Sequence, residues 1–279
     1  MLDKIPPMGQ SKAKTTGEIR LCPYCGEAME DRSFELNGRY CQYFACTCPQ
    51  YVQETRRQEE AEFRQELRAI EERNRAEHIQ RLKEKSGLGK RFLSRTFDNY
   101  QVNTTAQKTA HATAKAYAAN FAANLDQGRG LYLAGNFGTG KTHLAAAIAL
   151  NLLDQGYEVW FRTGAALLQE LRQRTVQEGE SEGRVVKGYG RVKLLILDDL
   201  GKEKATEWSV AVLGDIINQR YENALPLVIT SNYTLKTLAP ALTPPGNDGS
   251  VARSIISRLT EMTQGVTMAW DDRRQHGQP

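Results

Sequence analysis

The sequence predicts an α/β fold, with a five-stranded parallel sheet in its larger part and a small separate module at its start. Three observations support this prediction. Apolar runs alternate with helical segments from about residue 106 onward, a glycine-rich loop follows the first apolar run, and all five cysteines lie between residues 22 and 48. Alternating strands and helices indicate a parallel sheet covered on both faces. A chain of 279 residues with 40% hydrophobic content has room for a sizeable core and a second unit.

The cysteines of the first module form two close pairs with one cysteine between them. Four thiolates in two pairs, about twenty residues apart, are typical of a small zinc site, where the metal replaces the core that a short segment lacks. The predicted ligands are Cys22, Cys25, Cys46 and Cys48. Cys41 is an alternative ligand, because the Cys46-x-Cys48 pair is tighter than usual. A disulfide or buried free thiols are the competing interpretation, which the clustering and a cytoplasmic location disfavour.

A charged segment follows, with nine acidic and nine basic residues between positions 51 and 85. Phe63, Leu67 and Ile70 share one helical face, so we expect a helix with a thin apolar stripe. A solvated linker is the preferred interpretation, and a docking helix for a partner is the alternative. Glycines at 87 and 89 then interrupt the pattern. The expected domains are a zinc-binding module (1–50), a helical linker (51–87) and the α/β domain (88–279).

The larger domain opens with a helix expected around 106–125 and a buried strand at 131–135. That strand leads into the pattern G-x-x-x-x-G-K-[ST], which cradles the phosphates of nucleoside triphosphates. Backbone N–H groups turn inward around the anion, and the helix after the loop directs its positive dipole end toward it. The lysine serves the β- and γ-phosphates, and the threonine hydroxyl serves Mg²⁺. We therefore predict ATP and Mg²⁺ at Gly135, Asn136, Phe137, Gly138, Thr139, Gly140, Lys141 and Thr142.

Four further strands are expected at 158–162, 193–198, 226–231 and 265–269. The third strand of the domain ends in Asp198 and Asp199, at the carboxyl edge where α/β sheets place their ligands. The expected division of roles gives Asp198 to Mg²⁺ and Asp199 to the attacking water. The fourth strand ends in Thr230, Ser231 and Asn232, and the Asn232 amide is placed to hold the water or a phosphate oxygen.

Residues 176–190 contain four glycines and several charges, which predicts a mobile loop. A solvated surface loop is one interpretation. Contact with nucleic acid through Arg184, Lys187 and Arg191 is the other. The net charge of +4 permits such contact without favouring it. No apolar run approaches the length of a membrane span, and the start of the chain lacks the apolar core of a signal peptide, so a soluble cytoplasmic protein is expected.

Several motifs in order carry a family resemblance over residues 88–279. Besides the phosphate loop, the aspartate pair and Asn232, they are Arg91-Phe92, Thr96-Phe97-Asp98-Asn99-Tyr100 and Ser254-Ile255-Ile256-Ser257-Arg258-Leu259. Together they resemble the DnaC/DnaI helicase loaders, AAA+ ATPases related to the IstB transposition helpers. The resemblance implies an AAA+ P-loop fold without a helical lid domain, consistent with the few residues after the fifth strand. It also places the Asn232 strand between those of the phosphate loop and Asp198.

The resemblance further assigns roles to arginines that would otherwise read as surface charges. Arg258 matches the arginine finger, which reaches the ATP of a neighbouring subunit and implies self-association. Arg274 would sense the γ-phosphate of its own subunit. Loaders often have a second arginine where this chain has Ser254, and Arg253 is displaced from it by one residue. Many AAA+ ATPases have glutamate where this chain has Asp199, and the shorter side chain suits slow hydrolysis.

The function implied is ATP-dependent loading of a hexameric replicative DNA helicase onto single-stranded DNA during replication initiation. An IstB-like ATPase that assists DNA transposition is the alternative. The zinc module favours the loader, because some loaders carry a metal-binding module that docks the helicase. A zinc-dependent adaptor that only senses ATP is a third possibility.

Overall fold

The computed structural model describes residues 18–36 and 39–271, and the chain divides into two compact units, residues 1–74 and 75–279. None of the helices in the described part combines the length and hydropathy that crossing a membrane would require. The boundaries expected at residues 50 and 87 stay predictions.

The first unit contains two short antiparallel strand pairs. Strand β1 (Glu30–Asp31) pairs with β4 (Phe44–Ala45), and β2 (Phe34–Leu36) pairs with β3 (Arg39–Cys41). Its buried described residues before the long helix are few: Cys22, Ser33, Phe44 and Ala45. So little apolar burial cannot hold such short strands together alone, which fits the expectation that a metal supplies the missing core.

Helix α1 spans Pro49–Ser86 and confirms the helix expected over residues 51–85. Proline stands at its first position, where no backbone N–H is needed. Phe63, Leu67 and Ile70 are exposed, at 53%, 43% and 50% of their surface, so the apolar stripe lies in solvent. Balanced charges and an uncovered stripe match a solvated helix.

The end of α1 belongs to the second unit and is fixed there. Ser86 is fully buried, and its carbonyl accepts a hydrogen bond of 2.7 Å from Nη1 of Arg162. Gly87 follows with φ of +77°, and a Cβ at this position would meet the Arg162 guanidinium at 1.8 Å. Glycine is favoured here by this φ and by the Phe161 carbonyl oxygen, which an added Cβ would meet at 2.9 Å.

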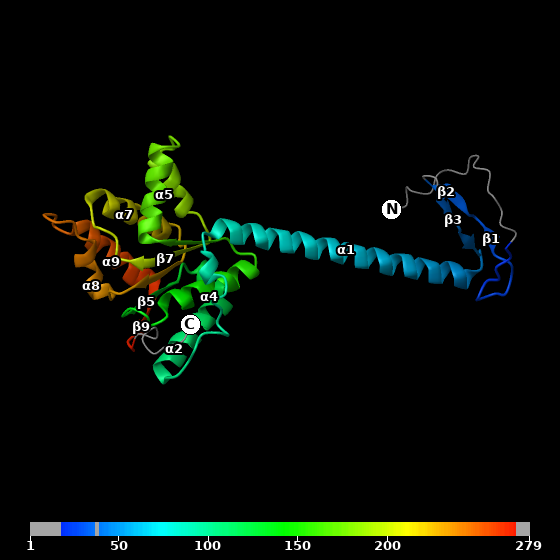
Figure 1. Cartoon of the computed structure of the whole chain (residues 1–279), viewed down its shortest axis with the longest axis horizontal. Coiled ribbons are helices and arrows are strands. Elements are labelled where there is room, and N and C mark those ends of the chain that lie inside the picture. Colours follow the sequence, from blue (N-terminus) through cyan, green and yellow to red (C-terminus); the bar gives the residue numbers. More distant parts are fainter. Residues whose placement is uncertain (1–17, 37–38, 272–279) are drawn as a thin grey trace. The chain divides into compact units, whose positions relative to one another are not determined.

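The second unit is built on one five-stranded sheet (Figure 1). The strands are β5 (Gly130–Gly135), β6 (Val159–Thr163), β7 (Leu194–Leu200), β8 (Leu227–Ser231) and β9 (Thr263–Met268), in the order β6-β7-β8-β5-β9. All neighbours pair in parallel. The expected parallel sheet is confirmed, and β8 lies between the phosphate-loop strand β5 and the aspartate strand β7.

Helices cover both faces of this sheet, and strand residues alternate between two cores. Leu131 and Leu133 of β5 face the core with α2 (Thr105–Ala119), α3 (Phe121–Asp126) and α4 (Lys141–Asp154). Tyr132 and Ala134 face the other core, formed with α5 (Gly164–Val176), α6 (Glu182–Tyr189), α7 (Glu207–Glu222), α8 (Leu235–Leu242) and α9 (Ser250–Met262). A 3-10 turn, η2 (Lys90–Phe92), precedes α2. The single helix expected around 106–125 is interrupted at Asn120.

The mobile loop predicted over residues 176–190 is wrong for its second half, which forms α6. Val185, Val186 and Tyr189 are buried, at 0%, 3% and 0% exposure, so the helix has an apolar face despite its glycines. Arg220 of α7 is also fully buried and donates to the Tyr189 carbonyl at 2.7 Å. This burial and this hydrogen bond outweigh the conformational cost of glycine in a helix.

Candidate nucleotide site and zinc centre

The phosphate loop connects β5 to α4 in the manner the sequence predicts. Gly138 and Gly140 adopt φ of +70° and +91°, which residues other than glycine rarely adopt. Lys141 begins α4, and its Nζ donates to the carbonyls of Gly135 at 2.8 Å and Asn136 at 2.7 Å. The N-terminal end of this 14-residue helix therefore faces the loop, as an anion-binding site requires.

Asn232 meets the same lysine. The Lys141 Nζ donates to its Oδ1 at 2.9 Å, joining the phosphate loop to the end of β8. The expected roles of Lys141 at the phosphates and of Asn232 at the water or a γ-phosphate oxygen stay predictions. The strand order makes this contact possible, because β8 is the neighbour of β5.

Asp198 lies at the centre of a hydroxyl cluster. Its Oδ1 accepts hydrogen bonds from Thr142 at 2.9 Å and Thr230 at 2.6 Å. Burial raises the pKa of this carboxyl above its usual range, and the bonds from Thr230 and Thr142 offset part of that effect. A buried carboxylate beside a hydroxyl matches the oxygen ligands that Mg²⁺ takes from protein, so Thr142 and Asp198 fit the ion.

Asp199 is held in a strained backbone position. Its φ is +59°, unusual for a residue with a side chain, and its N–H donates to the Thr230 hydroxyl at 2.8 Å. Its Oδ2 forms an ion pair of 2.7 Å with the Nζ of Lys202. Strain of this kind clusters at functional sites. Thr230 thus bonds both the Asp198 carboxylate and the Asp199 backbone, a role that sequence reasoning did not give it.

Two aromatic residues from outside the motif, Tyr100 and Trp270, contact the phosphate loop. The Tyr100 hydroxyl donates to the Thr139 carbonyl at 3.4 Å, and Trp270 Nε1 donates to the same oxygen at 3.0 Å. The Tyr100 ring also covers Gly140, where an added Cβ would meet it at 2.9 Å. The sequence analysis includes Tyr100 only as part of the resemblance, gives it no role, and does not single out Trp270. The only sequence signal for this contact was weak: an aromatic residue lies near each end of the domain that carries the phosphate loop.

The arginines have contacts within the chain. Arg258 lies on α9, where its guanidinium donates to the Ser254 hydroxyl and lies 5.8 Å from the Tyr221 ring centre. Arg253 donates to the Asp248 carbonyl at 2.7 Å and fixes the start of α9. Arg274 lies outside the described residues. The finger and sensor roles of Arg258 and Arg274 stay predictions.

The four predicted zinc ligands come together in the first unit. The sulfurs of Cys22, Cys25, Cys46 and Cys48 all lie within 4.8 Å of one another. The Cys22–Cys48 and Cys25–Cys46 sulfur distances are 3.7 and 3.6 Å. Tetrahedral zinc with bonds of about 2.3 Å places its sulfurs about 3.8 Å apart, so the residues fit the metal.

Backbone groups support the same interpretation. The N–H of Tyr51, in the first turn of α1, donates to Cys48 Sγ at 3.4 Å, and the N–H of Cys48 donates to Cys46 Sγ at 3.4 Å. Such bonds stabilise thiolates, the form that binds zinc. Cys41 lies outside the cluster on β3, with its Sγ directed to the Arg39 carbonyl at 3.9 Å.

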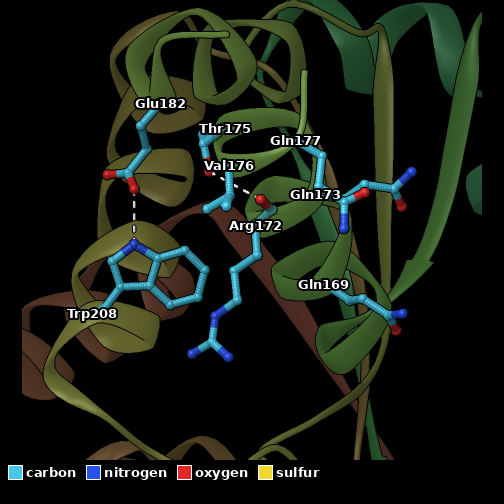
Figure 2. Close-up of a pocket in the computed structure, with 8 residues that line it drawn as sticks. All are labelled: Gln169, Arg172, Gln173, Thr175, Val176, Gln177, Glu182 and Trp208. Carbon is cyan, nitrogen blue, oxygen red and sulfur yellow. Dashed lines mark hydrogen bonds between the residues drawn. The ribbon is translucent and has the colours of Figure 1, made fainter. Parts of the chain in front are cut away.

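A surface pocket of about 670 Å³ lies between α5, the start of α6 and the start of α7 (Figure 2). Three glutamines spaced four residues apart line it: Gln169 and Gln173 on α5, and Gln177 directly after that helix. The Arg172 guanidinium lies 4.6 Å from the centre of the Trp208 ring, and Trp208 Nε1 donates to Glu182 at 2.8 Å. The sequence analysis did not identify this pocket.

The pattern of the family described as IstB-like ATP binding proteins matches residues 40–278. The chain belongs to this family. The replicative helicase loader DnaC of Escherichia coli K12 is 28% identical to this IstB-like protein over 174 residues, 62% of this chain and 70% of DnaC. A putative ATP-binding protein of insertion sequence IS5376 from Geobacillus stearothermophilus is 31% identical over 135 residues, 48% of this chain and 51% of the relative.

Solved structures show the same similarity for the second unit of this IstB-like protein. The crystal structure of the DnaC helicase loader covers 64% of this chain and 99% of its own, with a TM-score of 0.55 and 27% identity. The crystal structure of DnaI covers 67% and 95%, with a TM-score of 0.54 and 26% identity. The expected AAA+ P-loop fold and the resemblance to the loaders are confirmed.

Proposed function

We propose that this IstB-like protein is an ATPase that loads a hexameric replicative DNA helicase onto single-stranded DNA during replication initiation, in the cytoplasm. The observation that carries the proposal is a pair of bonds from adjacent residues of the loop motif, Lys141 to Asn232 and Thr142 to Asp198, in a chain similar to named helicase loaders. A four-cysteine cluster precedes that site and supplies a second module for a partner.

The site residues divide the chemistry of ATP hydrolysis among them. The loop and Lys141 would bind the phosphates, and Thr142 and Asp198 would hold Mg²⁺, which would neutralise charge on the transferring phosphoryl group. Asp199 orients the attacking water and receives its proton. Asn232 positions the water or a γ-phosphate oxygen. Arg258 of a neighbouring copy and Arg274 of the same chain complete the charge stabilisation in the assembled state.

We assign single-stranded DNA to the pocket between α5 and α7 (Figure 2). An arginine over a tryptophan offers a stacking surface for bases, and the amides of the three glutamines can donate and accept hydrogen bonds. Replacing Trp208 with alanine should weaken the binding of a fluorescent oligonucleotide about tenfold. Trp160, whose ring packs against Tyr189, provides the control as Trp160→Phe. Equal affinity in Trp208→Ala and wild type would remove the DNA site from this pocket.

The zinc module is assigned to capture the helicase, and co-purification tests it. The full chain, Lys141→Ala and the double variant Cys22→Ser/Cys25→Ser are each mixed with the host replicative helicase and ATP. If the chain is a helicase loader, the full chain should form a stable complex with the helicase, and the cysteine variant should not. Failure of the intact chain to bind any replicative helicase would overturn the proposal.

A second function has its own support, because the matched family takes its name from IstB and a relative belongs to an insertion sequence. In that case the chain is an ATPase that assists DNA transposition. ATP-dependent binding to duplex DNA and to a transposase, with no helicase complex, would establish it.

A further inference from the structure

The turn after β7 is built so that Lys202 points back to Asp199. The Lys202 N–H donates to the Asp199 carbonyl at 3.3 Å, which closes a tight turn with φ of +59° at Asp199 and +91° at Gly201. The Glu203 carboxylate accepts the Gly201 N–H at 3.1 Å and holds the far side of the turn. The position of Lys202 therefore follows from a fixed backbone.

The lysine makes two contacts inside the nucleotide site. Its Nζ lies 2.7 Å from Asp199 Oδ2 and 5.1 Å from the centre of the Phe137 ring in the phosphate loop. The Asp199 side chain is 31% exposed and that of Lys202 is 41% exposed, so the pair lies at the mouth of the site. A cation between these two groups bridges the loop and the carboxylate expected to receive a proton.

We propose that Lys202 is a positioning residue that restrains Asp199 and keeps ATP hydrolysis slow; this inference rests on the hydrolytic function proposed above. In the hydrolytic step, water oxygen bonds to the γ-phosphorus, the bond from γ-phosphorus to the β,γ-bridging oxygen breaks, and the water proton passes to Asp199. ADP and inorganic phosphate are the products. Lys202 holds Oδ2 of Asp199, so this oxygen can take the proton of the water only when the pair separates, and the pair also restrains rotation of the side chain toward the water.

The partial exposure of the Asp199–Lys202 pair limits how strongly it can slow ATP hydrolysis. Half-exposed ion pairs contribute little stability, so releasing Asp199 should raise the turnover number only about two- to fivefold. The KM for ATP should stay unchanged, because the lysine acts on the water-activating group and not on the phosphates. This separation of kcat from KM distinguishes restraint from a direct contact with nucleotide.

The experiment compares steady-state ATP hydrolysis by the full chain and four variants. Lys202→Met removes the charge and keeps the length, and Lys202→Arg keeps the ion pair. Lys204→Met, an exposed lysine on the same loop, is the matched control. The double variant Asp199→Asn/Lys202→Met tests whether the effect passes through Asp199. Circular dichroism and binding of a fluorescent ATP analogue establish that each variant is folded and binds nucleotide.

The expected result is a raised kcat in Lys202→Met alone, wild-type values in Lys202→Arg and Lys204→Met, and no turnover in the double variant. A lowered kcat or raised KM in Lys202→Met would show that the lysine serves the phosphates, and would overturn the restraint. An unchanged kcat would overturn it too. If wild type and every variant bind nucleotide without turnover, the proposed ATPase fails together with this inference.

Discussion

Removal of zinc should unfold the first module and leave the nucleotide domain intact. The double substitution Cys25→Ser/Cys48→Ser removes one sulfur from each close pair. The largest buried apolar side chain described before α1 is Phe44, at 7% exposure, and burying it contributes about 1.5–3 kcal/mol. A structural zinc site contributes about 10–16 kcal/mol near neutral pH. The metal therefore dominates the stability of residues 18–48 by several fold.

Two measurements check this prediction on the full chain. Elemental analysis should find one zinc per wild-type chain and none in the double variant. Hydrogen exchange should show lost protection across residues 18–48 and unchanged protection in β5 and α4. Cys41→Ser is the matched control, because Cys41 lies outside the cluster, and it should retain zinc. Protection of residues 18–48 that survives zinc removal would refute the reasoning.

Three further substitutions test the second unit. Asp198→Asn should raise the apparent melting temperature of the protein without nucleotide, because burial raises the pKa of this carboxyl and makes its charge unfavourable. The same substitution should abolish the stabilisation of the protein by Mg²⁺ and ATP. An increase in melting temperature with ATP that survives the substitution would contradict the assignment of Asp198 to Mg²⁺. Trp270→Phe removes the donor to the Thr139 carbonyl and should weaken binding of a fluorescent ATP analogue about fivefold, whereas unchanged affinity would separate this bond from nucleotide binding. Arg220→Met leaves the carbonyls of Tyr189 and Pro226 without their donor and should lower the free energy of unfolding by about 1–3 kcal/mol in urea titrations; an unchanged free energy of unfolding would mean that water replaces the guanidinium.

The sequence predicted β5, β7 and β8 well because each is an apolar run that ends in a polar or glycine turn, whereas β9 has only two buried residues among its six. β7 has the clearest pattern, with four buried residues from Leu194 to Leu197 followed by two aspartates. Periodicity gave the strands but not their order. The position of β8 beside β5 came from resemblance, and it decides whether Asn232 reaches Lys141.

Helix α6 could not be predicted from composition, because its glycines suggest a loop. Its stability depends on long-range partners, namely the core around Val185 and the guanidinium of Arg220, which lies 31 residues from Tyr189 in sequence. Arg220 itself gave no signal, since an arginine on a helix is normally a surface charge. Local sequence patterns cannot predict contacts between residues that are far apart in the sequence.

Both the motif itself and residues outside it determine the shape of the phosphate loop. The pattern accounts for Gly140 by its φ of +91°, which the turn into α4 requires. The structure adds a second reason, because the Tyr100 ring occupies the space where a Cβ would stand. Tyr100 precedes the first strand of the sheet, Trp270 follows the last, and both donate to the carbonyl of Thr139. The shape of the loop is therefore set from both ends of the domain. We therefore expect a substitution at either aromatic residue to change nucleotide binding without altering a residue of the motif.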